Sequence, residues 1–156
     1  MITLKNAAQI TAMRDAGRIT GEALLIARDM VRPGVSTYEI DQAIRKHIEK
    51  CGAKPSFLGY GGFPGSACIS INDEVIHGIP KRERIIMPGD LVKTDVGIFK
   101  NGFHGDTSRT VALGVTDPEV LRLVETTKRC LAAGIATCGP GVHLGDVGHA
   151  IESVAL

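Results

Sequence analysis

The first third of the chain carries two stretches in which hydrophobic residues recur at the spacing of one helix face. The first stretch predicts a helix from Asn6 to about Met30, which ends before Pro33-Gly34 because these residues stop a helix. The second opens with the capping-box sequence STYE at 36–39 and predicts a helix to about Lys50, capped by Gly52. The residues expected to be buried are Ile10, Met13, Gly17, Leu24 and Ala27, then Ile40, Ala43, Ile44 and Ile48.

From Pro55 to Pro88 the helical spacing is lost, and short strands with glycine-rich turns are expected, including a strand at 68–72. The sequence FLGYGGFPG at 57–65 lacks the Gly-Lys-Ser/Thr ending of a phosphate-binding loop, so we exclude that kind of site. Two interpretations stay open for it. It is either an irregular surface loop or, through Phe57, Tyr60 and Phe63, part of an apolar pocket.

The sequence from Asp90 to Ala112 predicts two strands joined by Asn101-Gly102, a dipeptide that strongly indicates a β-hairpin. A two-residue loop places Asp95 opposite Ser108, and Asp106 then lies diagonally across from Asp95. Because side chains alternate between the faces of a strand, both carboxylates are expected on the same face. The opposite face is expected to carry mostly core residues, namely Val92, Thr94, Val96, Ile98 and Val111.

Diagonal neighbours in a sheet lie about 7–8 Å apart, and side chains reach inward from there. Asp95 and Asp106 are therefore candidate ligands for one cation or a pair of cations. Two alternatives remain. The acids are simply solvated on an exposed hairpin, or a one-residue bulge places them on opposite faces of the sheet.

A further helix is predicted from Asp117, with Pro118 in its first turn, to about Thr137. Its expected buried residues are Val120, Leu121, Val124, Leu131 and Ile135.

Part of the sequence is repeated, because GPGVH at 139–143 resembles RPGVS at 32–36. Four more pairs match at the same spacing: Glu39 with Asp146, Ile40 with Val147, Ala43 with Ala150, and Ile44 with Ile151. This favours a duplicated fold, with one repeat at about 6–114 and a second, incomplete one at about 115–156. A complete second repeat would need on the order of 100 further residues, so we expect the chain to be a fragment of a two-repeat protein.

The composition mainly argues against certain classes of partner and location. The chain has 156 residues, 44% of them hydrophobic, and a net charge of +1, which is typical of one globular domain and gives no reason to expect nucleic acid as a partner. We find no secretory signal at the N-terminus and no apolar run long enough to cross a membrane, so a cytoplasmic protein is expected. The four cysteines have no CxxC spacing and are expected to be buried, reduced thiols.

The segments LGYGGFPGSACISINDEVIHGIP and MPGDLVKTDVGIFKNGFHGDTSRTVALG are similar to the N-terminal half of type I methionine aminopeptidases. The resemblance covers essentially all 156 residues as one catalytic domain. It implies an α/β fold of the duplicated pita-bread kind, in agreement with the internal repeat. It also implies removal of the initiator methionine from nascent polypeptides whose second residue is small, by an enzyme that acts as a monomer near the ribosome.

The resemblance also assigns site residues. Asp95 matches the acid that chelates one metal ion, Asp106 the acid that bridges two, and His77 the catalytic histidine that contacts the substrate near the scissile bond. The positions that match the lining of the methionine side-chain pocket are Phe57, Tyr60, Phe63 and Cys68. The positions that match a monovalent-cation site, through backbone carbonyls, are Asn72 and Glu74.

The implied cofactors are two divalent ions, cobalt, manganese, iron or zinc, which would activate a water molecule and polarise the peptide carbonyl. The resemblance further implies a histidine and two glutamates from a second half that the printed sequence does not contain. We therefore expect weak metal binding and less than full activity from this chain alone. The alternatives are a non-catalytic interaction module of the same fold, a proline-directed peptidase, and a half-chain that pairs with a second copy.

Overall fold

A computed structural model describes residues 3–156 and contains two compact units, one that ends at Gly114 and one over residues 115–156. The first contains helices α1 (Ala7–Met30) and α2 (Thr37–Lys50), a short 3₁₀ turn at Tyr60–Gly62, and strands β1 (Lys54–Pro55), β2 (Ala67–Ile71), β3 (Leu91–Lys100) and β4 (Phe103–Ala112). The second contains helices α3 (Pro118–Thr137) and α4 (Leu144–Ala155).

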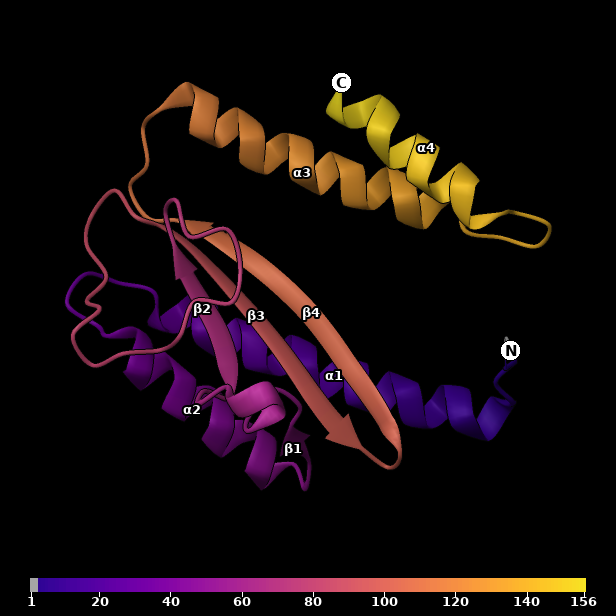
Figure 1. The fold of residues 1–156 in the computed structure, drawn as a ribbon, viewed down its shortest axis with the longest axis horizontal. Coiled ribbons are helices and arrows are strands. Elements are labelled where there is room, and N and C mark those ends of the chain that lie inside the picture. Colours follow the sequence, from indigo (N-terminus) through magenta and orange to yellow (C-terminus); the bar gives the residue numbers. More distant parts are fainter. Residues whose placement is uncertain (1–2) are drawn as a thin grey trace. The chain divides into compact units, whose positions relative to one another are not determined.

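Strand β3 is the centre of the antiparallel sheet, with β4 along one edge and both β2 and β1 along the other (Figure 1). The β3–β4 register runs without a bulge and pairs Asp95 with Ser108 and Gly97 with Asp106, as predicted. The turn residues Asn101 and Gly102 have φ values of 52° and 84°, the left-handed conformation that a two-residue hairpin loop of type I′ requires. Asp95 and Asp106 therefore share one face of the sheet.

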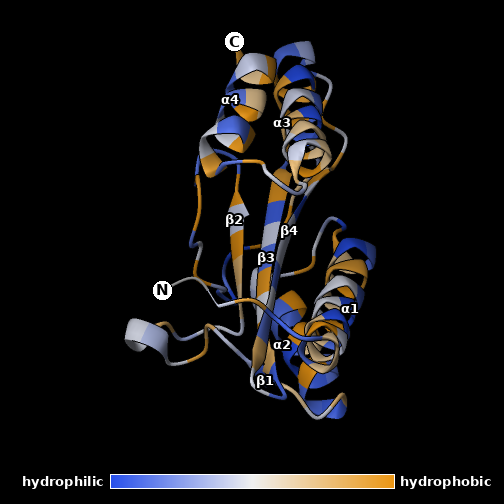
Figure 2. Cartoon of the chain, turned by 90° about the vertical axis from the view of Figure 1, so that its right-hand side faces the viewer, coloured by the Kyte–Doolittle hydropathy of each residue, from blue (hydrophilic) through white to orange (hydrophobic). Residues whose placement is uncertain are grey.

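Helices α1 and α2 cover the other face of this sheet, which Figure 2 shows edge-on. The core between them contains fully buried aliphatic side chains, because the strand residues that face the helices are nearly all apolar. The predicted core face is confirmed: Val92, Thr94, Val96 and Ile98 are buried, and Val111 packs at the margin. The side of the sheet that carries the two acids is left free of helices within this unit.

The helix ends follow the sequence closely. Ser36 and Glu39 form the expected capping box at the start of α2, and Gly52, with φ +67°, follows its last turn. The predicted buried face of α1 is wrong in its first half, where Ile10, Met13 and Gly17 are exposed. The stripe that packs on the sheet starts only at Ala16, because the first turns of α1 extend past the core.

One glycine allows α1 to approach β4 closely. A Cβ atom at Gly105 would lie 2.7 Å from the Ala16 carbonyl carbon and oxygen and 2.3 Å from Thr20 Oγ1. Gly105→Ala is expected to destabilise the fold by about 1–3 kcal/mol, because helix backbone cannot yield as a flexible side chain does. Urea unfolding followed by circular dichroism measures this loss.

Gly21→Ala is the matched control for Gly105→Ala. Gly21 lies in α1, and a Cβ atom there meets nothing within 4 Å, so the substitution is expected to stabilise the helix by about 0.5–1 kcal/mol. Equal effects of the two substitutions would contradict the close approach at Gly105.

The second unit is a helical hairpin. Its internal turn has the same local conformation as the α1–α2 turn: Gly141 (φ +82°) corresponds to Gly34 (φ +89°), and the Asp146 carboxylate accepts from the N–H of His143 at the start of α4. The buried residues predicted for α3 are wrong, since Leu121, Leu131 and Ile135 are exposed. Two helices alone shield only the strip between them, where Gly134 packs against Val147 and Ile151.

All four cysteines are free, but only Cys68 is buried, and Cys138 is exposed, so the expectation of four buried thiols is wrong. None of the helices within residues 3–156 is long and apolar enough to cross a membrane.

Candidate functional site

The helix-free face of the sheet brings Asp95 and Asp106 together. Asp95 is half-buried on β3 and Asp106 is exposed on β4, and their carboxyl groups are close enough to hydrogen-bond to each other. Burial, the charge of Asp106 and the hydrogen bond to it together raise the pKa of Asp95 to about 6. His77 and the Val96 N–H oppose this only in part.

A divalent cation fits this arrangement. Two carboxyl groups in contact repel each other when both are ionised, and a cation held between them removes that repulsion. Carboxylate oxygens are suitable ligands for manganese and iron and are also found on zinc. Asp95 and Asp106 can therefore hold a metal ion, although two ligands do not complete a coordination sphere.

Cys68 lies directly opposite Asp95 on the neighbouring strand β2. Burial, together with the negative charges of Asp95 and Asp106, raises the pKa of its thiol to about 11. The side chain is therefore a neutral thiol at physiological pH, and it forms an uncharged wall beside the two acids.

His77 is held beside the acids because the next residue packs tightly on the backbone of β2. The histidine is exposed and has a φ of +59°, a conformation that non-glycine residues seldom adopt. The next residue, Gly78, packs so tightly on β2 that a Cβ atom would lie 2.3 Å from the Ile69 carbonyl oxygen. Gly78 also donates to Ser70 Oγ and accepts from the Ile69 N–H, at 3.0 and 2.9 Å.

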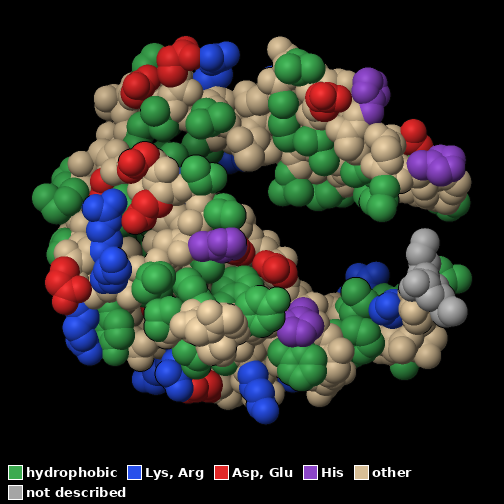
Figure 3. All heavy atoms as spheres, viewed as in Figure 1, with side chains coloured by type: hydrophobic (Ala, Val, Ile, Leu, Met, Phe, Trp, Pro, Cys, Tyr) green, Lys and Arg blue, Asp and Glu red, His purple; other side chains and the backbone are tan. Residues whose placement is uncertain are grey.

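An open pocket of about 510 Å³ adjoins this turn, and His77 is one of its lining residues. Its rim is mixed in character, with the carboxylate of Glu74 and the cationic side chains of Lys81 and Arg84 around Ile76 and Ile79. In Figure 3, histidine and acidic side chains lie among hydrophobic ones on the face of the unit turned to the viewer. A polar reaction centre with apolar surroundings is typical of small-molecule and peptide sites.

The aromatic residues of the loop at 57–65 lie in different environments. The Phe57 ring lies over Gly97, where a Cβ atom would come within 2.5 Å of it, and Gly97 pairs with Asp106 in the sheet. Phe57 thus borders the acidic pair. Tyr60 is 81% exposed and Phe63 is partly buried, so the loop does not enclose a pocket within this unit.

Asn72 and Glu74 lie in the turn after β2. Asn72 has a φ of +56°, and its side chain accepts from the Leu91 N–H and donates to Asp90. Its carbonyl oxygen accepts from the Lys93 ammonium group. A monovalent cation at this carbonyl would therefore have to share it with, or displace, a cationic side chain.

Sequence reasoning missed Gly97 and Lys93. A glycine inside a strand often marks a close approach of another group, so Gly97 was recognisable in principle. Lys93 carried no such signal, because only the fold brings its side chain to the turn at Asn72.

Comparison with known proteins identifies the family of this chain. The family model described as metallopeptidase family M24 matches residues 11–156. The methionine aminopeptidase of Clostridium acetobutylicum is 43% identical over 152 residues, which cover 97% of this chain and 61% of that protein. The methionine aminopeptidase of Aquifex aeolicus is 42% identical over 160 residues, with 99% and 62% covered. This chain therefore spans about 61% of the length of these curated relatives.

Solved structures of methionine aminopeptidases are similar to this chain as well. The methionine aminopeptidase from Thermotoga maritima superposes with a TM-score of 0.95 at 36% identity, over 99% of this chain and 62% of that one. The expected pita-bread fold is thereby confirmed for the part of the fold that the chain spans. With a matching family model over nearly its whole length and relatives above 40% identity, the chain belongs to metallopeptidase family M24.

Proposed function

We propose that this chain contributes to the removal of N-terminal methionine from polypeptides whose second residue is small. The observation that carries the proposal is the pair Asp95 and Asp106, in contact on the helix-free face of the sheet and beside His77 in an M24 chain. The relatives that it matches at 42–43% identity are named methionine aminopeptidases, which favours this substrate over other peptides.

Each residue has a proposed role. Asp95 and Asp106 would hold two divalent ions, which supply a water molecule of lowered pKa and polarise the scissile carbonyl group. His77 is fixed by the tight packing of Gly78 on β2. It contacts the substrate beside the scissile bond and stabilises the developing charge. Phe57 and the neutral thiol of Cys68 offer apolar surface to the methionine side chain, with Tyr60 and Phe63 at its margin.

The same proposal includes a monovalent cation, a partner, a cellular location and a place in the duplicated fold. We place the monovalent cation at the carbonyl groups of Asn72 and Glu74, with the Lys93 ammonium taking part of its role. We assign the nascent chain as partner, hence the cytoplasm as location, and the unit up to Gly114 as the first repeat of a duplicated domain.

The test joins this chain to the part of the Clostridium acetobutylicum enzyme that it does not match. The joined protein is expected to release methionine from Met-Ala-Ser with Mn²⁺, to lose this activity on chelation and to regain it when Mn²⁺ is added back. Met-Leu-Ser and Gly-Pro-Ala serve as matched peptides and are expected to be cleaved at least about tenfold more slowly.

The outcomes separate the alternatives. Preferred cleavage of Gly-Pro-Ala would replace the proposal with a proline-directed peptidase. A folded joined protein that binds Mn²⁺ in calorimetry but cleaves none of the peptides would indicate an interaction module. The chain by itself is expected to bind Mn²⁺ weakly, because two carboxylates leave most of the coordination sphere to water.

A further inference from the structure

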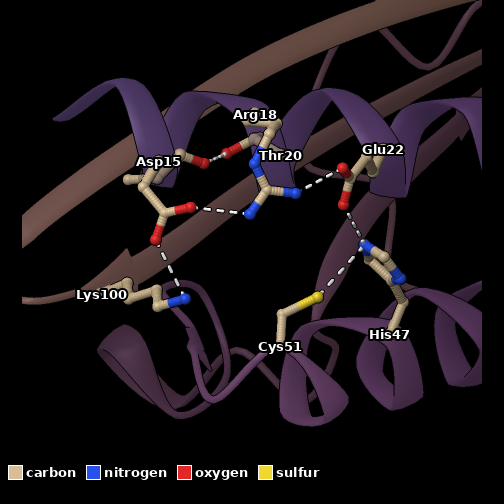
Figure 4. Close-up of polar contacts among 8 residues, drawn as sticks. Asp15, Arg18, Thr20, Glu22, His47, Cys51 and Lys100 are labelled. Carbon is tan, nitrogen blue, oxygen red and sulfur yellow. Dashed lines mark hydrogen bonds and ion pairs between the residues drawn. The ribbon is translucent and has the colours of Figure 1, made fainter. Parts of the chain in front are cut away.

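A second cluster of metal-binding side chains lies on the helices, away from the acidic face of the sheet. Glu22 projects from α1, His47 lies in the last turn of α2, and Cys51 is the residue that ends α2. His47 and Cys51 are four residues apart, so they share one face of the helix end. Figure 4 shows the three side chains pointing toward one another between the two helices.

The three ligand atoms already have nearly the spacing of a metal site. His47 Nε2 lies 3.3 Å from Glu22 Oε2 and 3.7 Å from Cys51 Sγ, and all three atoms lie within 4.8 Å of one another. A tetrahedral zinc ion, with bonds of about 2.0–2.3 Å, requires ligand atoms about 3.3–3.6 Å apart. The separation of 3.3 Å lies within this range, and that of 3.7 Å is only slightly longer.

The surroundings orient the ligands. Arg18 donates to Oε1 of Glu22, which leaves Oε2 directed at His47, and Arg18 is held in turn by Asp15 (Figure 4). Such outer contacts commonly fix the ligands of metal sites. The His47 side chain is only 19% exposed. Glu22 is 37% exposed, which leaves the cluster open on one side to a water molecule as fourth ligand.

We propose that Glu22, His47 and Cys51 form a zinc site that clamps α1 to α2. A thiolate together with an imidazole and a carboxylate selects zinc over magnesium, calcium or manganese. Zinc binding displaces the proton of the Cys51 thiol to solvent and leaves the oxidation state of the sulfur unchanged. The site does not depend on the proposed peptidase activity, since the helices lie on the face of the sheet opposite Asp95 and Asp106.

Cobalt(II) tests the ligand set, because a thiolate–cobalt bond gives an intense charge-transfer absorption in the near ultraviolet. The chain with cobalt is expected to show this band at one equivalent, to keep it in Cys68→Ala and to lose it in Cys51→Ala. Cys68 is the matched control because its thiol lies beside the acidic pair. A band lost in Cys68→Ala and kept in Cys51→Ala, or no band in the unsubstituted chain, would overturn the proposal.

Zinc affinity and thermal unfolding give an independent readout in an Asp106→Asn background, where the acidic pair contributes little. His47→Ala and Glu22→Gln are expected to weaken zinc binding at least about tenfold. Zinc at 100 times its Kd is expected to raise the Tm by about 5 °C or more, and this rise is expected to vanish in Cys51→Ala. Circular dichroism confirms that each variant folds. Unchanged zinc affinity in all three variants would refute the site.

Discussion

Replacing Asp106 with alanine is expected to lower Mn²⁺-dependent methionine release by the joined protein at least about 100-fold. Asp106 and Asp95 are in contact on the helix-free face, so removal of either carboxylate leaves a single acid where a pair held the metal. The loss is expected in kcat/KM at saturating metal, with a weaker apparent metal affinity. Initial rates with Met-Ala-Ser over a series of Mn²⁺ concentrations measure both quantities.

Two further variants make the result for Asp106 specific. Asp106→Asn keeps the size of the side chain and is expected to lose activity to a similar extent, which separates loss of charge from loss of packing. Asp29→Ala removes an exposed acid from the end of α1, where it pairs with Arg28, and is expected to change the rate less than about twofold. Full activity in Asp106→Ala would remove the acidic pair from the mechanism.

Asp41→Ala is expected to be the most destabilising single substitution that we describe, with a loss of about 2–5 kcal/mol. The side chain is 3% exposed, and its Oδ1 accepts from the N–H groups of Ser66 and Ala67, at 2.7 and 2.9 Å. Burial raises the pKa of Asp41, while these two N–H groups oppose the increase. Without the carboxylate, two buried backbone donors at the start of β2 are left without an acceptor.

Asp41→Asn is the control for this prediction, because an amide oxygen still accepts from one or both N–H groups. It is expected to cost at least about 1 kcal/mol less than Asp41→Ala in urea unfolding. Because β2 carries Cys68 and supports the turn at Gly78, the alanine variant is also expected to show faster amide exchange at Cys68 and Ile69. Equal losses of stability in the two variants would contradict the role of the acceptor oxygen.

The hairpin was predictable from sequence because its determinants are local. Asn101-Gly102 fixes the loop length, and the alternation of faces along each strand then fixes the side on which Asp95 and Asp106 lie. Helix ends were predictable for the same reason. The capping box at Ser36 and Glu39 and the proline at Pro118 act within one helical turn, so no distant contact is needed to interpret them.

The buried faces of helices were predicted less well, because burial depends on what lies opposite. Leu131 and Ile135 have the spacing of a core face, yet α3 packs only against α4 within its unit, and one side of it stays exposed. The start of α1 extends past the sheet, which leaves Ile10 and Met13 partly in solvent. Periodicity identifies an apolar face but does not supply the surface that covers it.

The sequence by itself determined the helix pair, the hairpin and its register, and the family resemblance. Each of these depends on the spacing of nearby residues or on a contiguous motif. Only the tertiary structure decided which distant residues meet. It set Phe57 over Gly97, locked the His77 turn onto β2 through Gly78, and brought Glu22 to His47 and Cys51. These contacts join segments that the chain keeps far apart, and they exist only once the helices and strands pack into one core.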